Sequence, residues 1–260
     1  MILLEPSANP VIGHRGAAAE APENTLPSFL RAIEQGVDAI ELDVQVTADD
    51  VPVVMHDPAA DRTTSGTGLI TAMSWRQLRE LDAGFRFTTD GGATFPYRDR
   101  GVRVPSVEEV LSAIPEDMPL VIEIKAIHAQ WPLRRILERF NAARRAVVAS
   151  FERSALGAFI DPPFVRGASR RDVLELMART AAGVKPGRVP YRAICAPNLY
   201  YGVPIPVGAI IRGAKRLGAP VHFWTVDDAP EARRLWQRGA SGIIPNAPGR
   251  ILEERKRSSQ

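Results

Sequence analysis

Short, mostly apolar runs alternate with longer amphipathic segments along most of the chain. The runs at 120–124 and 146–150 are largely apolar, as expected for strands that are buried on both faces. Segments 207–217 and 229–238 instead repeat apolar residues at the spacing of one helix face. Short strands that alternate with helices predict an α/β fold with a parallel sheet and right-handed crossovers.

Eight strands of this kind can be placed, at residues 11–13, 38–44, 120–124, 146–150, 165–168, 193–196, 220–225 and 242–244. A further apolar run, 51–55, follows 38–44 after a turn that is too short for a crossover helix, so we expect a hairpin there. Helices are predicted between the strands, at 25–35, 106–114, 132–143, 154–160, 170–182, 207–217 and 229–238. Eight parallel strands in 260 residues predict a closed (β/α)8 TIM barrel.

Residues 57–104 interrupt this alternation. They contain the Gly- and Thr-rich stretch 63–68 and the pair Gly91-Gly92, with one helical piece near 75–81. A long and weakly periodic insertion in a compact domain is often functional. We therefore expect a single domain over 1–260, with a small subdomain inserted at about 57–104 between the second and third barrel strands.

Two predicted strands carry ionisable residues at alternate positions. Glu41 and Asp43 are two residues apart, so their side chains point to the same face of the strand. Glu123 and Lys125 repeat this spacing. Two close carboxylates repel, and one becomes protonated near neutral pH unless a cation lies between them. A divalent metal ion with oxygen ligands would relieve the repulsion, whereas the alternative is a half-buried strand with a solvated acidic face.

Further ionisable residues follow other strands. His14 and Arg15 come directly after the first strand, and His56 follows the return strand of the hairpin. Active sites of such barrels lie at the C-terminal ends of the strands, so we expect these groups to meet at one mouth. Arginine and lysine neutralise phosphate, and two histidines can act as acid and base. The set predicts metal-assisted cleavage of a phosphodiester.

The chain resembles the glycerophosphodiester phosphodiesterase family through a series of motifs that covers nearly its whole length. They are His14-Arg15-Gly16, Pro22-Glu23-Asn24-Thr25, Glu41-Leu42-Asp43-Val44, Val53-Val54-Met55-His56-Asp57, Arg62-Thr63-Thr64, Leu81-Asp82-Ala83-Gly84, Pro105-Ser106-Val107-Glu108-Glu109-Val110, Glu123-Ile124-Lys125 and Trp224-Thr225-Val226. The motifs occur in order, and those that belong to strands stand at the expected strand ends.

The resemblance implies metal-dependent hydrolysis of small glycerophosphodiesters to sn-glycerol 3-phosphate and an alcohol. It also implies one divalent cation, Mg²⁺ or Ca²⁺, and an inserted subdomain near the mouth of the barrel. The residue roles that it implies are metal ligation by Glu41, Asp43 and Glu123, acid–base catalysis by His14 and His56, phosphate contact by Arg15 and Lys125, and an apolar wall at Trp224. It orders the two histidines as base and acid, respectively.

The sequence departs from the family pattern in two places. Asp49-Asp50 stands where such sequences often have Asp-Gly, which changes only the type of a turn. Ile244-Pro245-Asn246 replaces the usual Thr-Asp after the last strand, so we expect a different last loop and pocket floor.

Several other polar residues have simpler interpretations. We expect Glu23-Asn24 to cap a helix and His128 and His222 to have structural roles, since neither histidine belongs to a motif. Tyr200-Tyr201 lies in a Pro-rich loop, where it would contact substrate or cover the barrel. The charged stretch Glu253–Arg257 is predicted to be frayed.

Composition narrows the possible partners. The net charge is only +3, without a basic stripe interleaved with aromatic residues, so we expect no nucleic-acid partner. The sequence contains no apolar run of about 18 residues, no leader-like N-terminus and no amphipathic basic helix. We therefore predict a cytoplasmic protein without stable membrane association, and its single cysteine fits a reducing compartment.

Two other functions remain open at this stage. One is a related barrel that cleaves intact phospholipids, similar to phospholipase D or phosphoinositide-specific phospholipase C. The other is a non-catalytic barrel that binds a phosphate ester, although a binding protein needs no acid–base pair. The sequence leaves the alcohol group of the substrate, the native metal and the oligomeric state undefined.

Overall fold

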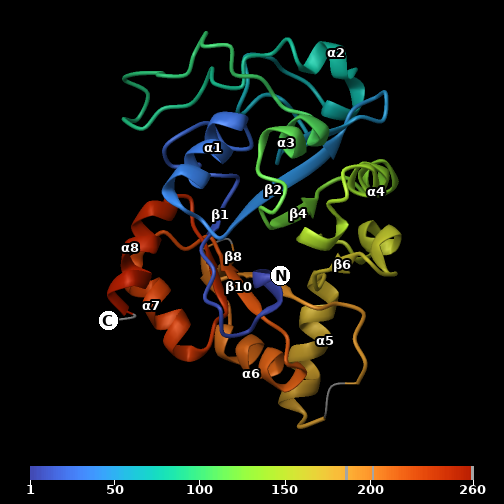
Figure 1. Ribbon diagram of the computed structural model, residues 1–260, viewed down its shortest axis with the longest axis vertical. Helices are drawn as coiled ribbons and strands as arrows, with labels where there is room; N and C mark the ends of the chain where they lie inside the picture. Colours follow the sequence, from blue (N-terminus) through green and yellow to red (C-terminus); the bar gives the residue numbers. More distant parts are fainter. Residues whose placement is uncertain (185–186, 201, 259–260) are drawn as a thin grey trace.

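The structure, a computed structural model, describes residues 1–184, 187–200 and 202–258 and contains a (β/α)8 TIM barrel, as predicted (Figure 1). Its strands are β1 (Ile12–Gly13), β2 (Ala39–Val46), β4 (Leu120–Ile124), β5 (Ala146–Ala149), β6 (Val165–Arg166), β7 (Ile194–Pro197), β10 (Val221–Trp224) and β11 (Gly242–Ile244). They pair in parallel in the orders β1-β2-β4-β5-β6 and β11-β10-β7. Parallel bridges between Gly167 and Ala193 and between Val11 and Ile243 close the barrel.

Helices surround the strands at the positions that the apolar spacing indicates. They are α1 (Leu26–Gln35), α3 (Val107–Ala113), α4 (Gln130–Arg139), α5 (Arg170–Ala181), α6 (Val207–Leu217) and α7 (Ala229–Arg238), while 3₁₀ helix η5 (Arg153–Phe159) takes the place of one predicted helix. No helix among the described residues is both long and apolar enough to cross a membrane.

The expected fraying of the C-terminal stretch is wrong up to residue 258, because α8 (Pro248–Ser258) is helical there. Its Ile251 and Leu252 side chains are buried in the main hydrophobic core. Its buried Glu254 carboxylate accepts a hydrogen bond from Arg233 of α7. The apolar residues that pack this helix against the core lie just before the charged stretch, and fraying was predicted from that charged stretch alone.

Strand alternation decides which residues face the inside of the barrel. Ala39 of β2 and Val121 of β4 pack in an interior cluster with Leu3, whereas Ile40 and Ile122 belong to the larger core that includes the surrounding helices. Since residues two apart share a face, Glu41, Asp43 and Glu123 follow the interior residues. The carboxylates thus continue the inner face of β2 and β4 toward the C-terminal mouth.

The N-terminal segment packs into the same interior cluster. Leu3, in η1 (Ile2–Leu4), is fully buried, and its carbonyl oxygen accepts a hydrogen bond of 3.0 Å from Nε2 of His222. Burial lowers the pKa of His222 to about 4, so the side chain is neutral near pH 7. This contact is the structural role expected for His222, whereas His128 lies exposed in η3 (Ile127–Ala129).

The predicted hairpin is present, with β3 (Pro52–Val54) antiparallel to β2. The segment that follows has its own hydrophobic cluster, which includes Val53 and Leu78, and it contains η2 (Ile70–Ala72) and α2 (Trp75–Leu78). Figure 1 shows this segment in teal and green at one end of the molecule, beside α1 and α3. The extent of a separate subdomain at 57–104 stays a prediction.

A short antiparallel pair, β8 (Leu199–Tyr200) with β9 (Val203–Pro204), lies between β7 and α6. The prediction for Tyr200-Tyr201 falls outside the described residues, because Tyr201 and the side chain of Tyr200 are not among them.

Candidate active site

The tight turn after β1 brings His14 and Arg15 to the barrel mouth. Gly16 has φ +88°, and a Cβ atom there would lie 2.4 Å from Oγ of Ser28, so only glycine fits. Ser28 also donates a hydrogen bond of 2.8 Å to the carbonyl oxygen of Arg15, which has φ 52°. The turn is therefore held against the first turn of α1, and the side chains of His14 and Arg15 project from a fixed backbone.

The three predicted metal ligands come together at the mouth. One carboxylate oxygen from each of Glu41, Asp43 and Glu123 lies within 4.8 Å of the other two. Asp43 and Glu123 are direct partners in the register of β2 and β4, which explains their proximity. This spacing and the choice of oxygen donors fit a hard divalent cation.

The electrostatics of the cluster also fit a cation. Burial and the charge of Asp43 raise the pKa of Glu41 well above its usual value, and burial raises the pKa of Glu123. Burial would also raise the pKa of Asp43, but Lys125 and Arg15 outweigh it and hold that pKa below its usual range. A bound cation would stabilise the ionised forms of Glu41 and Glu123.

Two basic side chains partly compensate the carboxylates. Nε of Arg15 lies 3.0 Å from Oδ2 of Asp43. Nζ of Lys125 lies 3.1 Å from Oδ1 of Asp43 and donates a hydrogen bond of 2.7 Å to Glu123. Lys125 is thus an ion-pair partner of the acidic cluster as well as a candidate phosphate contact.

His14 is held by a chain of contacts with residues that follow β10 and β11. Its Nδ1 lies 2.7 Å from Oδ1 of Asn246. The Nδ2 group of Asn246 donates to Oδ2 of Asp227 at 2.9 Å, and its backbone N–H donates to Oδ1 of Asp227 at 2.6 Å. Since the amide oxygen accepts, the neutral His14 ring carries its proton on Nδ1 and leaves Nε2 with a free lone pair.

The residue that replaces the family's usual aspartate is therefore a neutral partner of His14. Burial, together with the charge of Arg15, lowers the pKa of His14 to about 4. Nε2 lies 4.0 Å from Oε2 of Glu41. The departure from the family pattern changes the surroundings of a candidate catalytic histidine, whose ring is neutral near pH 7 and keeps the lone pair on Nε2 available.

His56 has a different partner. Its Nδ1 lies 2.6 Å from Oδ1 of Asp57, whose other oxygen accepts a hydrogen bond of 2.6 Å from Arg62. Arg62 also binds Glu23 through two contacts of 2.7 Å, and Glu23 accepts a hydrogen bond of 2.8 Å from Arg15. This ionic chain links the segment after the hairpin to the turn after β1.

The predicted capping role of Asn24 is wrong. The N-cap of α1 is Thr25, and Asn24 has φ 58°. The Nδ2 group of Asn24 donates to Oδ2 of Asp43 at 2.9 Å, and its Oδ1 accepts from the Asp43 backbone N–H at 3.2 Å. Asn24 therefore orients a candidate metal ligand. The motif Pro22-Glu23-Asn24-Thr25 contributed to the family resemblance, but it did not indicate the contact between Asn24 and Asp43.

Most of the predicted site residues line one cavity of about 230 Å³, which we call the catalytic cavity. Trp224 forms part of its wall and packs edge-to-face against Phe151, with ring centroids 5.8 Å apart. Asp43 is not among the residues that line the cavity, and only 1% of its surface is exposed. The predicted residues that line the cavity are His14, Arg15, Glu41, His56, Glu123, Lys125 and Trp224.

Comparisons with known proteins agree with these motifs. The model of the glycerophosphoryl diester phosphodiesterase family matches residues 14–250. A glycerophosphodiester phosphodiesterase of Caldanaerobacter subterraneus subsp. tengcongensis is 31% identical over 257 residues, which cover 93% of this chain and 96% of the relative. A glycerophosphodiester phosphodiesterase of Bacillus subtilis is 28% identical, with coverages of 95% and 86%.

Solved structures show the same architecture. A glycerophosphodiester phosphodiesterase from Agrobacterium tumefaciens is similar with a TM-score of 0.72 and 26% identity, covering 94% of this chain and 99% of the other. A phosphodiesterase from Oleispira antarctica, solved in complex with the product sn-glycerol-3-phosphate, shares the fold with a TM-score of 0.77 and 24% identity, over 95% and 96% of the two chains. This chain therefore belongs to the glycerophosphoryl diester phosphodiesterase family, as its motifs predicted.

Proposed function

We propose that this enzyme hydrolyses glycerophosphodiesters to sn-glycerol 3-phosphate and an alcohol, with one divalent cation and two catalytic histidines. The main observation behind the proposal is that His14 and His56 line the same cavity as the carboxylates and the basic side chains of the barrel mouth. The activity named for the relatives from Caldanaerobacter and Bacillus supports it. A pure phosphate-ester binder would not need two histidines with separate hydrogen-bond partners.

Glu41, Asp43 and Glu123 would hold the cation, either Mg²⁺ or Ca²⁺, since hard cations take oxygen ligands. When bound, such an ion supplies Lewis-acid stabilisation of negative charge on phosphoryl oxygens. Asn24 supports this role by fixing one carboxylate oxygen and the backbone of Asp43. Contacts of this kind behind a metal ligand set its orientation.

Two basic side chains would bind the phosphate. Arg15 lines the catalytic cavity beside the carboxylates and presents a planar guanidinium group, which can contact two phosphate oxygens at once. Lys125 lies on the β4 side of the cavity and contributes a point charge. Trp224 would close the cavity as an apolar wall.

His14 is the proposed general base. Its Nδ1–H donates to Asn246, so the lone pair on Nε2 can take a proton from the attacking oxygen. That oxygen belongs to water or to a neighbouring glycerol hydroxyl. As the new P–O bond forms, the proton of the attacking group moves to His14, and burial keeps the ring neutral beforehand.

His56 is the proposed general acid. Burial lowers the pKa of His56, whereas the charge of Asp43 and the hydrogen bond from Nδ1–H to Asp57 oppose this shift and stabilise the imidazolium form. Nε2–H can then give its proton to the departing alcohol oxygen as the P–O bond to that oxygen breaks. The different partners of the two histidines, an amide and a carboxylate, support this division of roles.

The proposal is tested by incubating the purified protein with several glycerophosphodiesters and measuring glycerol 3-phosphate by an enzyme-coupled assay. We expect release with Mg²⁺ or Ca²⁺, none after exhaustive chelation, and recovery when the ion is restored. A barrel that prefers intact phospholipids would instead release a headgroup from diacyl lipids and leave the glycerophosphodiesters unchanged. A barrel that only binds phosphate esters would release neither product.

A further inference from the structure

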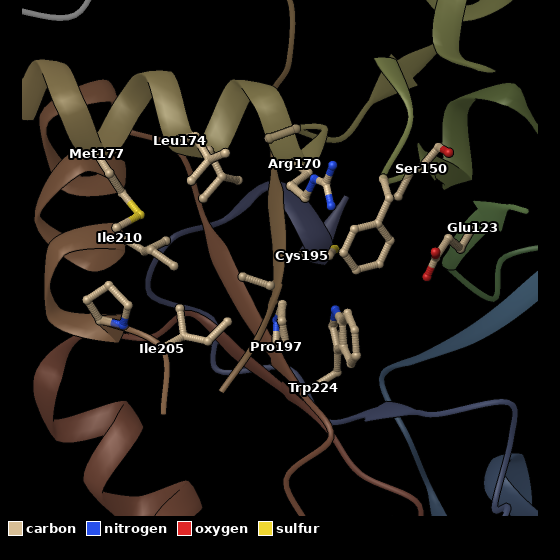
Figure 2. Close-up of a pocket in the computed structure, with 16 residues that line it drawn as sticks. Glu123, Ser150, Arg170, Leu174, Met177, Cys195, Pro197, Ile205, Ile210 and Trp224 are labelled. Carbon is tan, nitrogen blue, oxygen red and sulfur yellow. The ribbon is translucent and has the colours of Figure 1, made fainter. Parts of the chain in front are cut away.

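A second cavity adjoins the catalytic cavity on the side of β7, α5 and α6. It has a volume of about 240 Å³, and we call it the apolar chamber. The two cavities have lining residues in common: Glu123, Ala149, Phe151, Cys195 and Trp224. Figure 2 shows Glu123 at one end of the chamber and Met177, Ile205 and Ile210 at the other. The chamber therefore extends from a candidate metal ligand toward the helices.

The far part of the chamber offers almost no hydrogen-bonding groups. Its walls there are formed by Val173, Leu174, Met177, Ile205, Pro206 and Ile210. The hydroxyl group of Ser150 is already used, because it donates a hydrogen bond of 2.8 Å to the carbonyl oxygen of Ile124.

This lining selects against small polar alcohols. Of the described residues around the chamber, only Glu123 and Arg170 are charged. Glu123 already pairs with Lys125, whereas Arg170 forms no salt bridge within the described part of the chain. A choline or ethanolamine group placed in the far part of the chamber would lose its hydration without a new partner, because only apolar side chains line that part.

The size of the chamber suits one chain. Its volume exceeds that of an engineered apolar cavity of roughly 150 Å³ that binds benzene. The rim also carries an apolar group, since Leu174 lines the chamber and is 58% exposed. A chain that enters the chamber would meet apolar surface at the rim as well as inside.

We propose that the apolar chamber binds a single unbranched alkyl or acyl chain of the phosphodiester substrate. This inference rests on the proposed function and names a substrate class for it: glycerophosphodiesters that carry one apolar chain. Because the chamber begins at Glu123, the chain would leave the phosphodiester close to the reacting phosphate. The chain belongs either to the departing alcohol or to the glycerol, and the chemistry of recognition is the same for both.

The test is a substrate series in which only the chain changes, assayed below the micellar concentration with Mg²⁺ or Ca²⁺. Glycerophosphoethanol is the short reference. Glycerophosphobutanol and glycerophosphooctanol place the chain on the departing alcohol, whereas 1-octanoyl-glycerophosphoethanol places it on the glycerol. We expect kcat/KM to rise up to about fourfold per added methylene in one arm, which corresponds to about 0.8 kcal/mol. The chain position at which kcat/KM rises, either on the departing alcohol or on the glycerol, identifies the source of the chain.

A variant of α5 makes the test specific to the chamber. Met177→Trp fills the far part, so we expect it to lower the ratio of kcat/KM for the octyl substrate to that for the ethyl substrate at least about tenfold, the effect of losing two or more buried methylenes. The matched control is Ala178→Trp, an exposed position on the same helix that does not line the chamber, and it should leave that ratio unchanged.

The possible outcomes distinguish a failure of the chamber proposal from a failure of the proposed function. Hydrolysis of the ethyl substrate without any gain from a longer chain overturns the chamber proposal and leaves the proposed function intact. A gain that Met177→Trp does not reduce also overturns it, because the chain then binds elsewhere. If no diester in the series is hydrolysed, the proposed function fails and the chamber proposal fails with it.

Discussion

The two halves of the barrel mouth present different chemistry. The half formed by β1, β2 and β4 carries His14, Arg15, Glu41 and Glu123, whereas the half formed by β5, β7 and β10 presents Ala149, Cys195 and Trp224. One fold thus keeps charged groups and apolar groups in adjoining cavities that share a wall, which includes Glu123. Under the two proposals above, the reaction and the substrate preference are assigned to separate strands of one barrel.

Loss of the cation should have the largest effect on the charged half. Chelation is expected to abolish hydrolysis, and Glu41→Gln or Glu123→Gln to lower kcat/KM by about 10³-fold or more, because a metal ion stabilises charge by several kcal/mol. Isothermal titration with Mg²⁺ and Ca²⁺ checks that the loss follows metal binding. Glu80→Gln, at an exposed position away from the site, should behave like the parent protein. Full activity after exhaustive metal removal contradicts the metal site.

The histidines come next in size. His14→Ala and His56→Ala are each expected to lower kcat by about 10²–10⁴-fold, the range for positioned proton transfer. The double variant should lose less than the product of the two, because the residues act as a unit. His128→Ala is the matched control, since His128 is exposed and lies outside the cavity.

A substrate with a good leaving group distinguishes the acid from the base. A nitrophenyl ester needs little protonation of the departing oxygen, so His56→Ala should retain much more activity on it than on a natural diester. His14→Ala should lose activity on both, because the attacking oxygen still needs a base. Equal losses for both variants on both substrates would contradict the assignment of roles.

Arg15→Lys should have a smaller effect of about 10- to 100-fold on kcat/KM, because the charge remains but a charge-assisted hydrogen bond worth about 1.5–3 kcal/mol is lost. The kinetic loss is measured beside Arg31→Lys, a surface substitution in α1 that keeps the charge of an exposed ion pair. If Arg15→Lys hydrolyses substrate at the parent rate, Arg15 does not clamp the phosphate.

The smallest expected effect concerns the support of His14. Asn246→Ala and Asp227→Ala should each lower kcat by about tenfold, the loss that corresponds to one hydrogen bond. Because they act through one chain of contacts, the double variant should lose little more than either single variant. Additive losses would show that Asp227 does not act on His14 through Asn246. Thermal unfolding of each variant checks that the fold persists.

The fold and the charged half were largely predictable from local sequence patterns. Strand alternation in β2 alone placed Glu41 and Asp43 on one face, and the position of Glu123 near the end of β4 placed it at the same mouth. The supporting contacts were not predictable in this way. His14 and Asn246 are 232 residues apart, and Glu23 and Arg62 are 39 apart, so neither pair leaves a local signal.

The apolar half was even less predictable from the sequence. Residues such as Met177 and Ile210 have the spacing of ordinary helix core positions. Whether such side chains fill the space between α5 and α6 or line an opening depends on how the two helices pack. Only the assembled barrel reveals the chamber, because packing between distant segments determines where volume is left over.

The most direct test of the division between the two halves is one ratio, kcat/KM for glycerophosphooctanol or 1-octanoyl-glycerophosphoethanol, whichever carries the chain effect, divided by kcat/KM for glycerophosphoethanol. It is measured for the parent protein, Arg15→Lys and Met177→Trp. We predict that Arg15→Lys slows both substrates of the pair by the same factor and leaves the ratio unchanged, whereas Met177→Trp lowers the ratio at least about tenfold. A ratio that changes equally in both variants would contradict the separation of reaction chemistry from chain recognition.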